Sequence, residues 1–153
     1  MKLVNAHFDS ETGKSWAVIE HKKTKFVGHA KCHPDDRAEV SKFAGCGYAE
    51  SRAIIKALKF ERKEEIKECE AIRKFVKAVT QYKDFDSTSR EARAMFRQLN
   101  RRIKKVNMLT MKINEEMRNL EAAIAQRDVV KRAIKRRRGQ RAEAIKLEDG
   151  KLV

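Results

Sequence analysis

Apolar residues recur at steps of three and four along the second half of the chain, the spacing of one face of an α-helix. The seam is broken only at Thr110. Its members are Ala92, Phe96, Leu99, Ile103, Val106, Ile113, Met117, Leu120 and Ile124. This pattern predicts a long helix with a coiled-coil-like surface over roughly four heptads.

The ends of this helix carry their own signals. Thr88 and Glu91 have the spacing of a capping box, which predicts that the helix begins at Ser89. The heptad pattern fails after Ile124, and a glycine is a common helix stop. We therefore expect the helix to end near Arg138 and residues 139–153 to form a flexible tail.

Short apolar segments in the first part of the chain, such as 16–19, indicate strands. The predicted strands are Leu3–Phe8, Ser15–His21 and Thr24–Cys32. The connection formed by Lys22 and Lys23 is short enough for a tight hairpin, although it lacks the Asn-Gly sequence that such turns prefer. Side chains alternate along a strand, so one face of the third strand should carry Phe26, Gly28, Ala30 and Cys32.

A second helical stripe runs from about Ala49 to Val79, after a loop rich in small residues at 43–48. Its apolar members are Ile55, Leu58, Cys69, Ile72, Val76 and Val79. Arg62 and Glu65 interrupt it in the middle. The first half of this helix should cover the sheet, and the second half should pair with the long helix.

The predicted fold class is α+β: a three-stranded antiparallel sheet covered by a helix, then a long antiparallel helical hairpin. The expected divisions are a head at 1–60, a hairpin at 61–138 and a tail at 139–153. The first helix spans about 45 Å and the second about 70 Å at 1.5 Å per residue. The surplus seam, from about Met117 onward, predicts a homo-oligomer because exposed apolar stripes usually mark interfaces.

The chain has 37 Lys and Arg residues against 22 Asp and Glu residues, a net charge of +15. Such an excess favours polyanionic partners: nucleic acid, phosphorylated small molecules or an anionic surface. No apolar run approaches the roughly 20 residues needed to span a bilayer. Three scattered cysteines fit a reducing cytoplasm without a disulfide framework.

Two sets of residues on the long helix and just before it are candidates for binding. Cations on a helix surface can grip phosphates, amides can contact base or ribose edges, and aromatic rings can stack on bases. The ligand-binding candidates are Tyr82, Phe85, Arg97, Asn100, Arg101, Arg102, Lys104 and Lys105. The nucleic-acid-binding candidates are Lys131, Arg132, Lys135, Arg136, Arg137 and Arg138. Alternatively, the first set solubilises a coiled coil, and the second stabilises a helix C-terminus through the helix dipole.

Metal and cofactor chemistry is not expected. Cys32, His33 and Cys46 lack the paired short spacing of structural zinc ligands. The order of elements, with Asp9 after the first strand, 16–19 in the second and 48–58 opening the helix, resembles the start of a ribonuclease H-like fold. That resemblance implies Asp9 and Glu50 as metal-facing carboxylates. No apolar fourth strand follows the helix, so we expect no catalysis.

Small size, high charge and a coiled-coil region resemble bacteriophage accessory proteins, in particular sponges that sequester nucleotide immune signals, of the anti-Thoeris type. The resemblance implies a non-enzymatic homo-oligomer in the host cytoplasm that binds phosphate-rich ligands and sequesters a cyclic nucleotide or a related signal. The alternatives are a DNA- or RNA-binding protein, a ribonuclease H-like nuclease and a purely structural coiled coil.

Overall fold

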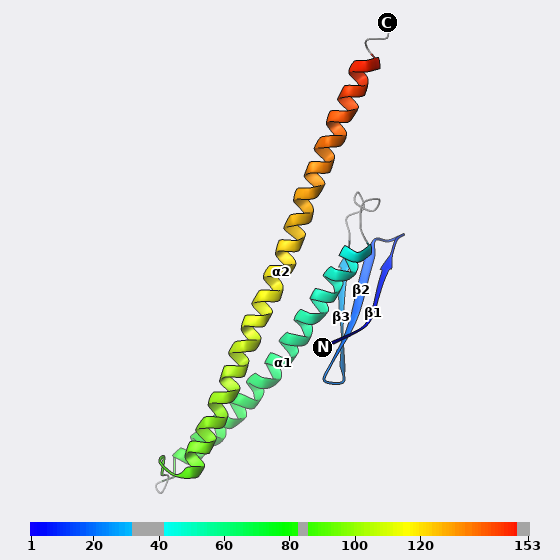
Figure 1. Ribbon diagram of the computed structural model, residues 1–153. Helices are drawn as coiled ribbons and strands as arrows, with labels where there is room; N and C mark the ends of the chain where they lie inside the picture. The colour runs from blue at the N-terminus through cyan, green and yellow to red at the C-terminus, as the bar shows by residue number, and fades with distance from the viewer. Residues whose placement is uncertain (32–41, 83–85, 150–153) are drawn as a thin grey trace. The chain divides into compact units, whose positions relative to one another are not determined.

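The computed structural model describes residues 1–31, 42–82 and 86–149, with side chains described up to 137 except at 42, 43, 131 and 134. The elements in chain order are β1 (Lys2–Asp9), β2 (Lys14–His21), β3 (Thr24–Lys31), α1 (Lys42–Thr80) and α2 (Arg90–Asp149) (Figure 1). The chain divides into two compact units, Met1–Met117 and Arg118–Val153. The first unit has the predicted α+β architecture: an antiparallel sheet packed on α1, and a second long helix that contacts α1.

The three strands form one antiparallel sheet in the order β1-β2-β3, and each predicted strand is confirmed to within one or two residues. The pairing of His21 with Thr24 leaves a two-residue hairpin loop. Both loop residues have positive φ, 51° at Lys22 and 65° at Lys23. Such values suit the right-handed twist of the flanking strands but are strained for residues other than glycine.

One face of the sheet packs against α1. The face carries the buried side chains of Ser15, Ala17 and Ile19 on β2. On β3, Phe26 and Ala30 lie opposite Ile19 and Ser15, so they share this face as predicted, whereas Cys32 lies outside the described residues. Gly28 allows very close packing, because a Cβ atom there would lie 1.9 Å from the carbonyl oxygen of Ala49.

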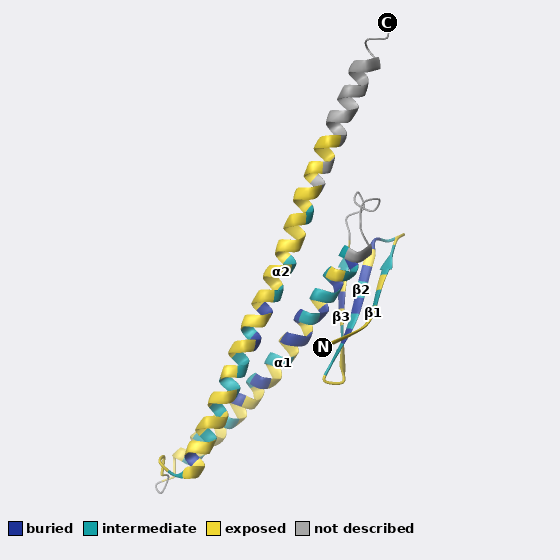
Figure 2. Cartoon of the chain, viewed as in Figure 1, coloured by how far each residue is buried: buried dark blue, intermediate teal, exposed yellow. Residues whose placement is uncertain are grey.

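Small residues on α1 make this close approach possible. Ala53 and Ala57 are fully buried and form a core cluster with Ile19. Figure 2 shows the buried positions of α1 and β2 in dark blue where helix and sheet meet. Each buried aliphatic side chain stabilises the fold by about 1.5–3 kcal/mol.

The first turns of α1 correct the prediction of a loop at 43–48. The helix already begins at Lys42, so the two glycines of this stretch are helical. A Cβ atom at Gly45 would lie 2.3 Å from the Ser15 hydroxyl oxygen, so a larger residue there would force the Ser15 side chain to move. Glycine lowers helix propensity in general, and here it lets the helix lie against the sheet.

The outer edge of β3 is covered by side chains of α1. Arg52 donates a hydrogen bond of 2.6 Å to the His29 carbonyl, and Lys56 donates one of 2.7 Å to the Val27 carbonyl. These carbonyls face away from β2 and would otherwise be open to another strand.

The N-terminal cap of α2 differs from the predicted capping box. Ser89, not Thr88, caps the helix: its hydroxyl oxygen accepts a hydrogen bond of 3.1 Å from the Ala92 amide. The Thr88 amide and hydroxyl instead donate to a carboxylate oxygen of Asp86, at 2.8 and 2.7 Å. The predicted start is right within one residue because a serine stands next to the threonine.

The two helices of the first unit run antiparallel. Leu58 packs with Leu109 and Ile113, and farther along α1 Glu65 meets Arg102, so contacts run in opposite order along the two helices. Leu109 is buried although it was not assigned to the predicted seam. Phe96, a predicted seam member, is 37% exposed, because the seam faces α1 only in part.

The second unit consists of the continuation of α2. The helix passes through Gly139 and ends at Asp149, so the predicted end near Arg138 is wrong. One glycine is tolerated in a helix interior at a cost of about 1 kcal/mol. Among the described residues, no helix is both long enough and apolar enough to cross a bilayer.

Candidate functional site

The predicted cations of α2 fall on two faces of the helix, and only one face meets α1. On the inner face, Arg102 and Lys105 surround the buried carboxylate of Glu65. An Arg102 guanidinium nitrogen lies 2.9 Å from one Glu65 oxygen, and Lys105 Nζ lies 2.6 Å from the other. Arg102 also reaches Glu68 at 3.6 Å.

The electrostatics of this inner network match its geometry. The hydrogen bond from Lys105 is the largest influence on Glu65 and holds the pKa of that carboxyl below its usual value, with Arg102 contributing. In return, the hydrogen bond to Glu65 raises the pKa of Lys105. Both shifts favour the charged forms of Glu65 and Lys105, and the two predicted ligand-binding cations are engaged in holding α1 against α2.

The network extends to the sheet through Glu61. Its carboxylate lies 2.9 Å from His21 Nε2, 2.6 Å from Lys22 Nζ and 3.5 Å from Lys105 Nζ. Burial alone would raise the pKa of Glu61, but the hydrogen bonds from Lys22 and His21 outweigh it and hold the pKa at about 2. Glu61 thus links the strained hairpin loop, α1 and α2.

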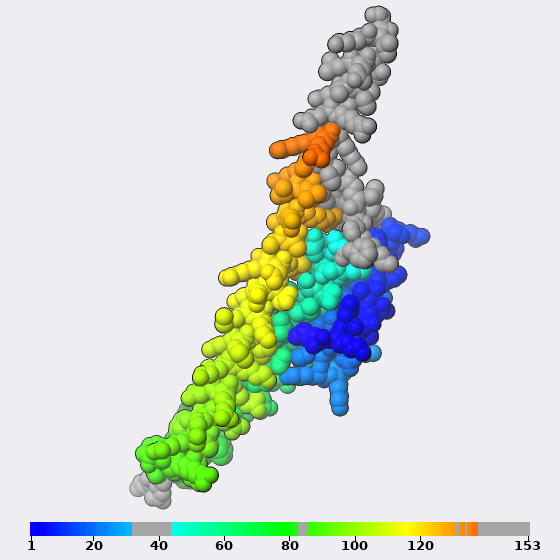
Figure 3. All heavy atoms as spheres, in the orientation of Figure 1, coloured from blue at the N-terminus to red at the C-terminus, as the bar shows by residue number. Residues whose placement is uncertain are grey.

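The outer face of α2 carries a row of cations that we call the outer basic stripe. Its members are Arg90, Arg93, Arg97, Arg101 and Lys104. Steps of three and four residues place them on one side of the helix, and all five side chains are exposed. The stretch that carries the stripe is drawn in green to yellow-green in Figure 3.

The outer basic stripe is uniform in sign. Glu91 is the only acidic residue from Ser89 to Asn114. Among the described residues, no carboxylate forms a salt bridge with a stripe cation. Arg97 uses its Nε to donate to the Arg93 carbonyl at 3.2 Å, and the residue is exposed. Asn100 is exposed on the same side, three residues after Arg97.

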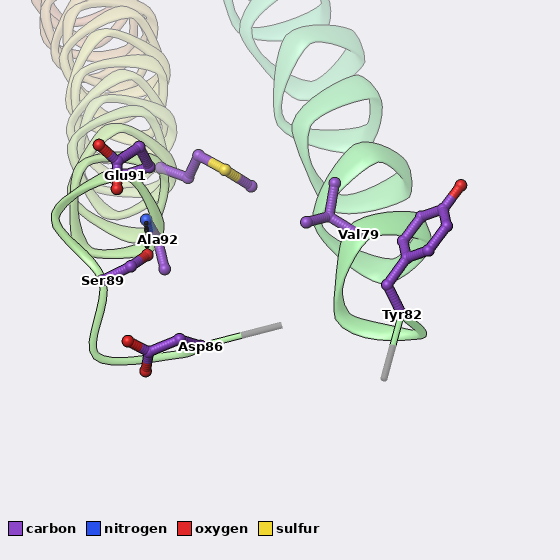
Figure 4. A pocket seen from close by; sticks show the side chains of 7 residues that line it. Val79, Tyr82, Asp86, Ser89, Glu91 and Ala92 are labelled. Atoms are coloured by element: carbon purple, nitrogen blue, oxygen red, sulfur yellow. Dashed lines mark hydrogen bonds between the residues drawn. The ribbon is translucent and has the colours of Figure 1, made fainter. Parts of the chain in front are cut away.

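The predicted aromatic partners lie at the hairpin bend. Tyr82 is 73% exposed and lines an open hollow of about 480 Å³ between the end of α1 and the first turn of α2 (Figure 4). Among its described lining residues, the hollow carries the carboxylates of Asp86 and Glu91 and no cation, and these two carboxylates disfavour a phosphate. Phe85 lies outside the described residues.

A smaller hollow of about 200 Å³ lies between the helices. It is lined by Ile66, Cys69, Glu70, Arg73, Ile103, Val106 and Asn107. Its single arginine stands beside a glutamate, so this hollow offers little net positive charge.

The predicted nucleic-acid-binding run belongs to the second unit and lies within α2. Its described side chains are all exposed: Arg132, Lys135, Arg136 and Arg137. The side chains of Lys131 and Arg138 lie outside the description. No acidic residue stands between Lys131 and Arg141, so the run is a second concentration of positive charge.

Asp9 and Glu50, the carboxylates suggested by the ribonuclease H-like resemblance, lie in surroundings that serve the fold. Asp9 accepts hydrogen bonds from the Glu11 amide at 2.9 Å and the Thr12 amide at 3.3 Å, and another from the Thr12 hydroxyl. The Thr12 hydroxyl is the main reason that the pKa of Asp9 is lowered. Glu50 is half-buried on α1. The described residues contain no group of three or more His, Cys, Asp or Glu side chains that could hold a metal ion.

Sequence reasoning missed the acidic partners, Glu61 and Glu65, and the first two members of the stripe, Arg90 and Arg93. The available signal was the position of Glu65 within an apolar stripe, where a buried charge requires a partner on the facing helix. No protein-family model, curated protein or solved structure matches the chain.

Proposed function

We propose that the protein binds nucleic acid through the outer basic stripe of α2. The observation that carries this proposal is the division of the cations: inner ones are paired with α1 carboxylates, whereas five outer ones are exposed and unpaired with described acids. From Arg90 to Lys104 the stripe extends about 21 Å along the helix axis. An extended row of cations suits successive phosphates of a polymer.

Arginine strengthens the proposal because its planar fork matches phosphate oxygens bidentately. Four of the five stripe residues are arginines. The exposed cations at Arg132, Lys135, Arg136 and Arg137 add a second segment of the same chemistry. The proposed role needs no catalytic group.

A small nucleotide is less well supported than a polymer. The larger hollow carries Asp86 and Glu91, and the stripe is a line rather than an enclosure. The predicted sequestration of an immune-signal nucleotide requires a pocket formed with a second copy of the chain, and it stays a prediction together with self-association. Met108 and Met111, exposed by 57% and 72% on α2, are apolar surface that a second copy can cover.

Charge reversal of the stripe tests the proposal. Arg97→Glu with Arg101→Glu should weaken binding of a labelled 20-base-pair duplex by at least about tenfold at moderate salt, since two phosphate contacts become repulsive. The slope of log affinity against log salt should become shallower by about 1.8, because each contact contributes about 0.9. Fluorescence anisotropy at several salt concentrations measures both quantities.

The matched control is Lys59→Glu with Lys63→Glu. These lysines are exposed on α1, have the same spacing and change the net charge equally. The control should keep most of the duplex affinity. Equal losses in both variants would show that only net charge matters, and an unchanged slope in the stripe variant would place binding elsewhere.

A further inference from the structure

The sheet has a second face, which α1 does not cover. Helix α1 packs against the sheet on the side of Ala17 and Ile19 (Figure 1). Because side chains alternate along a strand, Trp16 and Val18 point to the other side. We call that side the open face; from β1 to β3 its residues are His7, Asn5, Trp16, Val18, His29 and Val27.

A row of three rings crosses the open face. Trp16 stands in the central strand, paired in register with His7 on β1 and with His29 on β3. The His7 and Trp16 ring centroids lie 5.7 Å apart at an angle of 35°. Trp16 is half-buried, and both histidines are exposed. A large apolar ring between two imidazoles, open to water, is a surface on which another flat ring gains burial.

The rim of the open face is basic. Lys2 and Lys25 flank Glu20 at one end, and Lys14 and Lys31 are register neighbours at the other. All four lysines are exposed. The remaining acid, Asp9, is engaged by the Glu11 and Thr12 amides. A second copy docked face to face would bring lysines against lysines, so charge complementarity favours a polyanion.

A surface that binds unpaired bases needs aromatic rings on which the bases stack and cations that bind the phosphates. The open face has both, because its rings lie inside a basic rim. We propose that the open face binds single-stranded nucleic acid by stacking bases on Trp16 and its flanking histidines. This inference rests on the proposed nucleic-acid-binding function and deepens it, since it names single strands as a ligand class. Duplex bases are already stacked and cannot present their ring faces in this way.

Trp16 is the only tryptophan of the chain, so its intrinsic fluorescence reports the site directly. Titration of the full-length protein with dT12 or U12 should quench this emission in a saturable manner. Inorganic polyphosphate, which has the charge but no bases, and a blunt duplex should leave it nearly unchanged. Quenching by both oligonucleotides assigns the site to bases in general, and quenching by one alone assigns it to DNA or RNA.

Substitution separates stacking from charge. Trp16→Leu should weaken dT12 binding about 5- to 150-fold, the range for losing one stacked base, whereas Trp16→Phe should retain most of the affinity. The control Phe75→Leu removes an exposed aromatic side chain of α1 and should have no effect. Thermal unfolding checks that each variant is folded. The titration of the unmodified protein tests the proposal even if a variant does not fold.

The outcomes distinguish this inference from the stripe. If polyphosphate quenches as strongly as dT12, or if dT12 binds without quenching, the open face is not a stacking surface, whatever happens at the stripe. If Arg97→Glu with Arg101→Glu loses duplex binding but still shows quenching by dT12, both proposals are supported. If that variant keeps duplex binding while dT12 quenches, the stripe proposal fails and the open face stands. Absence of all binding overturns both.

Discussion

The inner and outer faces of α2 carry the same kinds of side chain in opposite states. On the inner face, Arg102 and Lys105 lie within hydrogen-bonding distance of the buried Glu65 carboxylate. On the outer face, Arg101 and Lys104 stand next to them in sequence and are exposed. A rotation of about 100° per residue separates a structural ion pair from a binding surface.

This difference shows that the role of a charged residue depends on whether another element packs against its face of the helix. Neighbouring arginines at 101 and 102 have identical chemistry, yet only Arg102 meets carboxylates of α1. Removal of an inner partner should therefore change stability, whereas removal of outer charge should change binding. The predictions below test how far this separation holds.

The largest effect on stability is expected at Glu65. Glu65→Ala removes the closest carboxylate of Arg102 and of Lys105 and leaves them only the longer contacts with Glu68 and Glu61. Breaking a fully buried pair destabilises by about 3–5 kcal/mol, and because these cations are 31% and 41% exposed we expect about 2 kcal/mol. Urea denaturation followed by circular dichroism measures the free energy of unfolding.

Glu64→Ala is the control for this variant. Glu64 is 50% exposed and pairs at 2.9 Å with Lys67 on the same helix. Its loss should change the free energy of unfolding by less than about 0.5 kcal/mol. The double variant Arg97→Glu with Arg101→Glu should have an equally small effect on stability. A loss at the stripe as large as that at Glu65 would break the distinction between the two faces.

The acid dependence of stability should reveal Glu61. The pKa of this carboxyl is lowered from 4.5 to about 2, so its contribution is complete above about pH 4.5 and disappears as the pH falls through 2. Lys22 is 57% exposed and water screens its charge, so we expect the contribution to be about 1–2 kcal/mol. Denaturation at pH values from 2 to 7 should show a smaller acid-induced loss in Glu61→Gln than in the unmodified protein. Identical profiles would mean that the carboxylate contributes nothing.

A smaller effect than those at Glu65 and Glu61, and one of opposite sign, is expected at the hairpin loop. Lys23 has a φ of 65°, which costs a residue other than glycine about 1–2 kcal/mol. Lys23→Gly removes this strain but increases the conformational entropy of the unfolded chain. We therefore expect the free energy of unfolding to rise by about 0.5–1 kcal/mol, which a higher melting temperature would show. Lys22→Gly relieves similar strain but loses the 2.6 Å contact with Glu61, so it should gain less. A larger gain at Lys22 would show that its ion pair does not stabilise the loop.

The strands could be predicted because short apolar segments are separated by the turn after Asp9 and by the two-lysine loop, which leaves one register for β2 and β3. The start of α1 could not, because Gly45 is typical of a loop until its close approach to Ser15 is known. The same close packing at Gly28 depends on a helix that is distant in sequence. The fold class therefore follows from local patterns, whereas these boundaries depend on tertiary contacts.

The candidate site was predictable only as a concentration of positive charge. The heptad pattern placed Ile113 correctly in the interface but omitted Leu109, which is buried beside it. That omission left the rotation of α2 about its axis undetermined, so Arg97 and Arg102 were assigned together. The position of Glu65 could have determined the rotation of α2, since a carboxylate at the interface requires cations on the facing side of the other helix.

The hydrogen bonds from Arg52 and Lys56 to the carbonyls of β3 limit how the protein can assemble through its sheet. They occupy two carbonyls on the β3 edge, and in the described sheet this leaves β1 as the edge that can accept a further strand. Edge-to-edge pairing of sheets therefore stops at a dimer, because each molecule offers one free sheet edge. The sheet is thereby guarded against open-ended fibril growth.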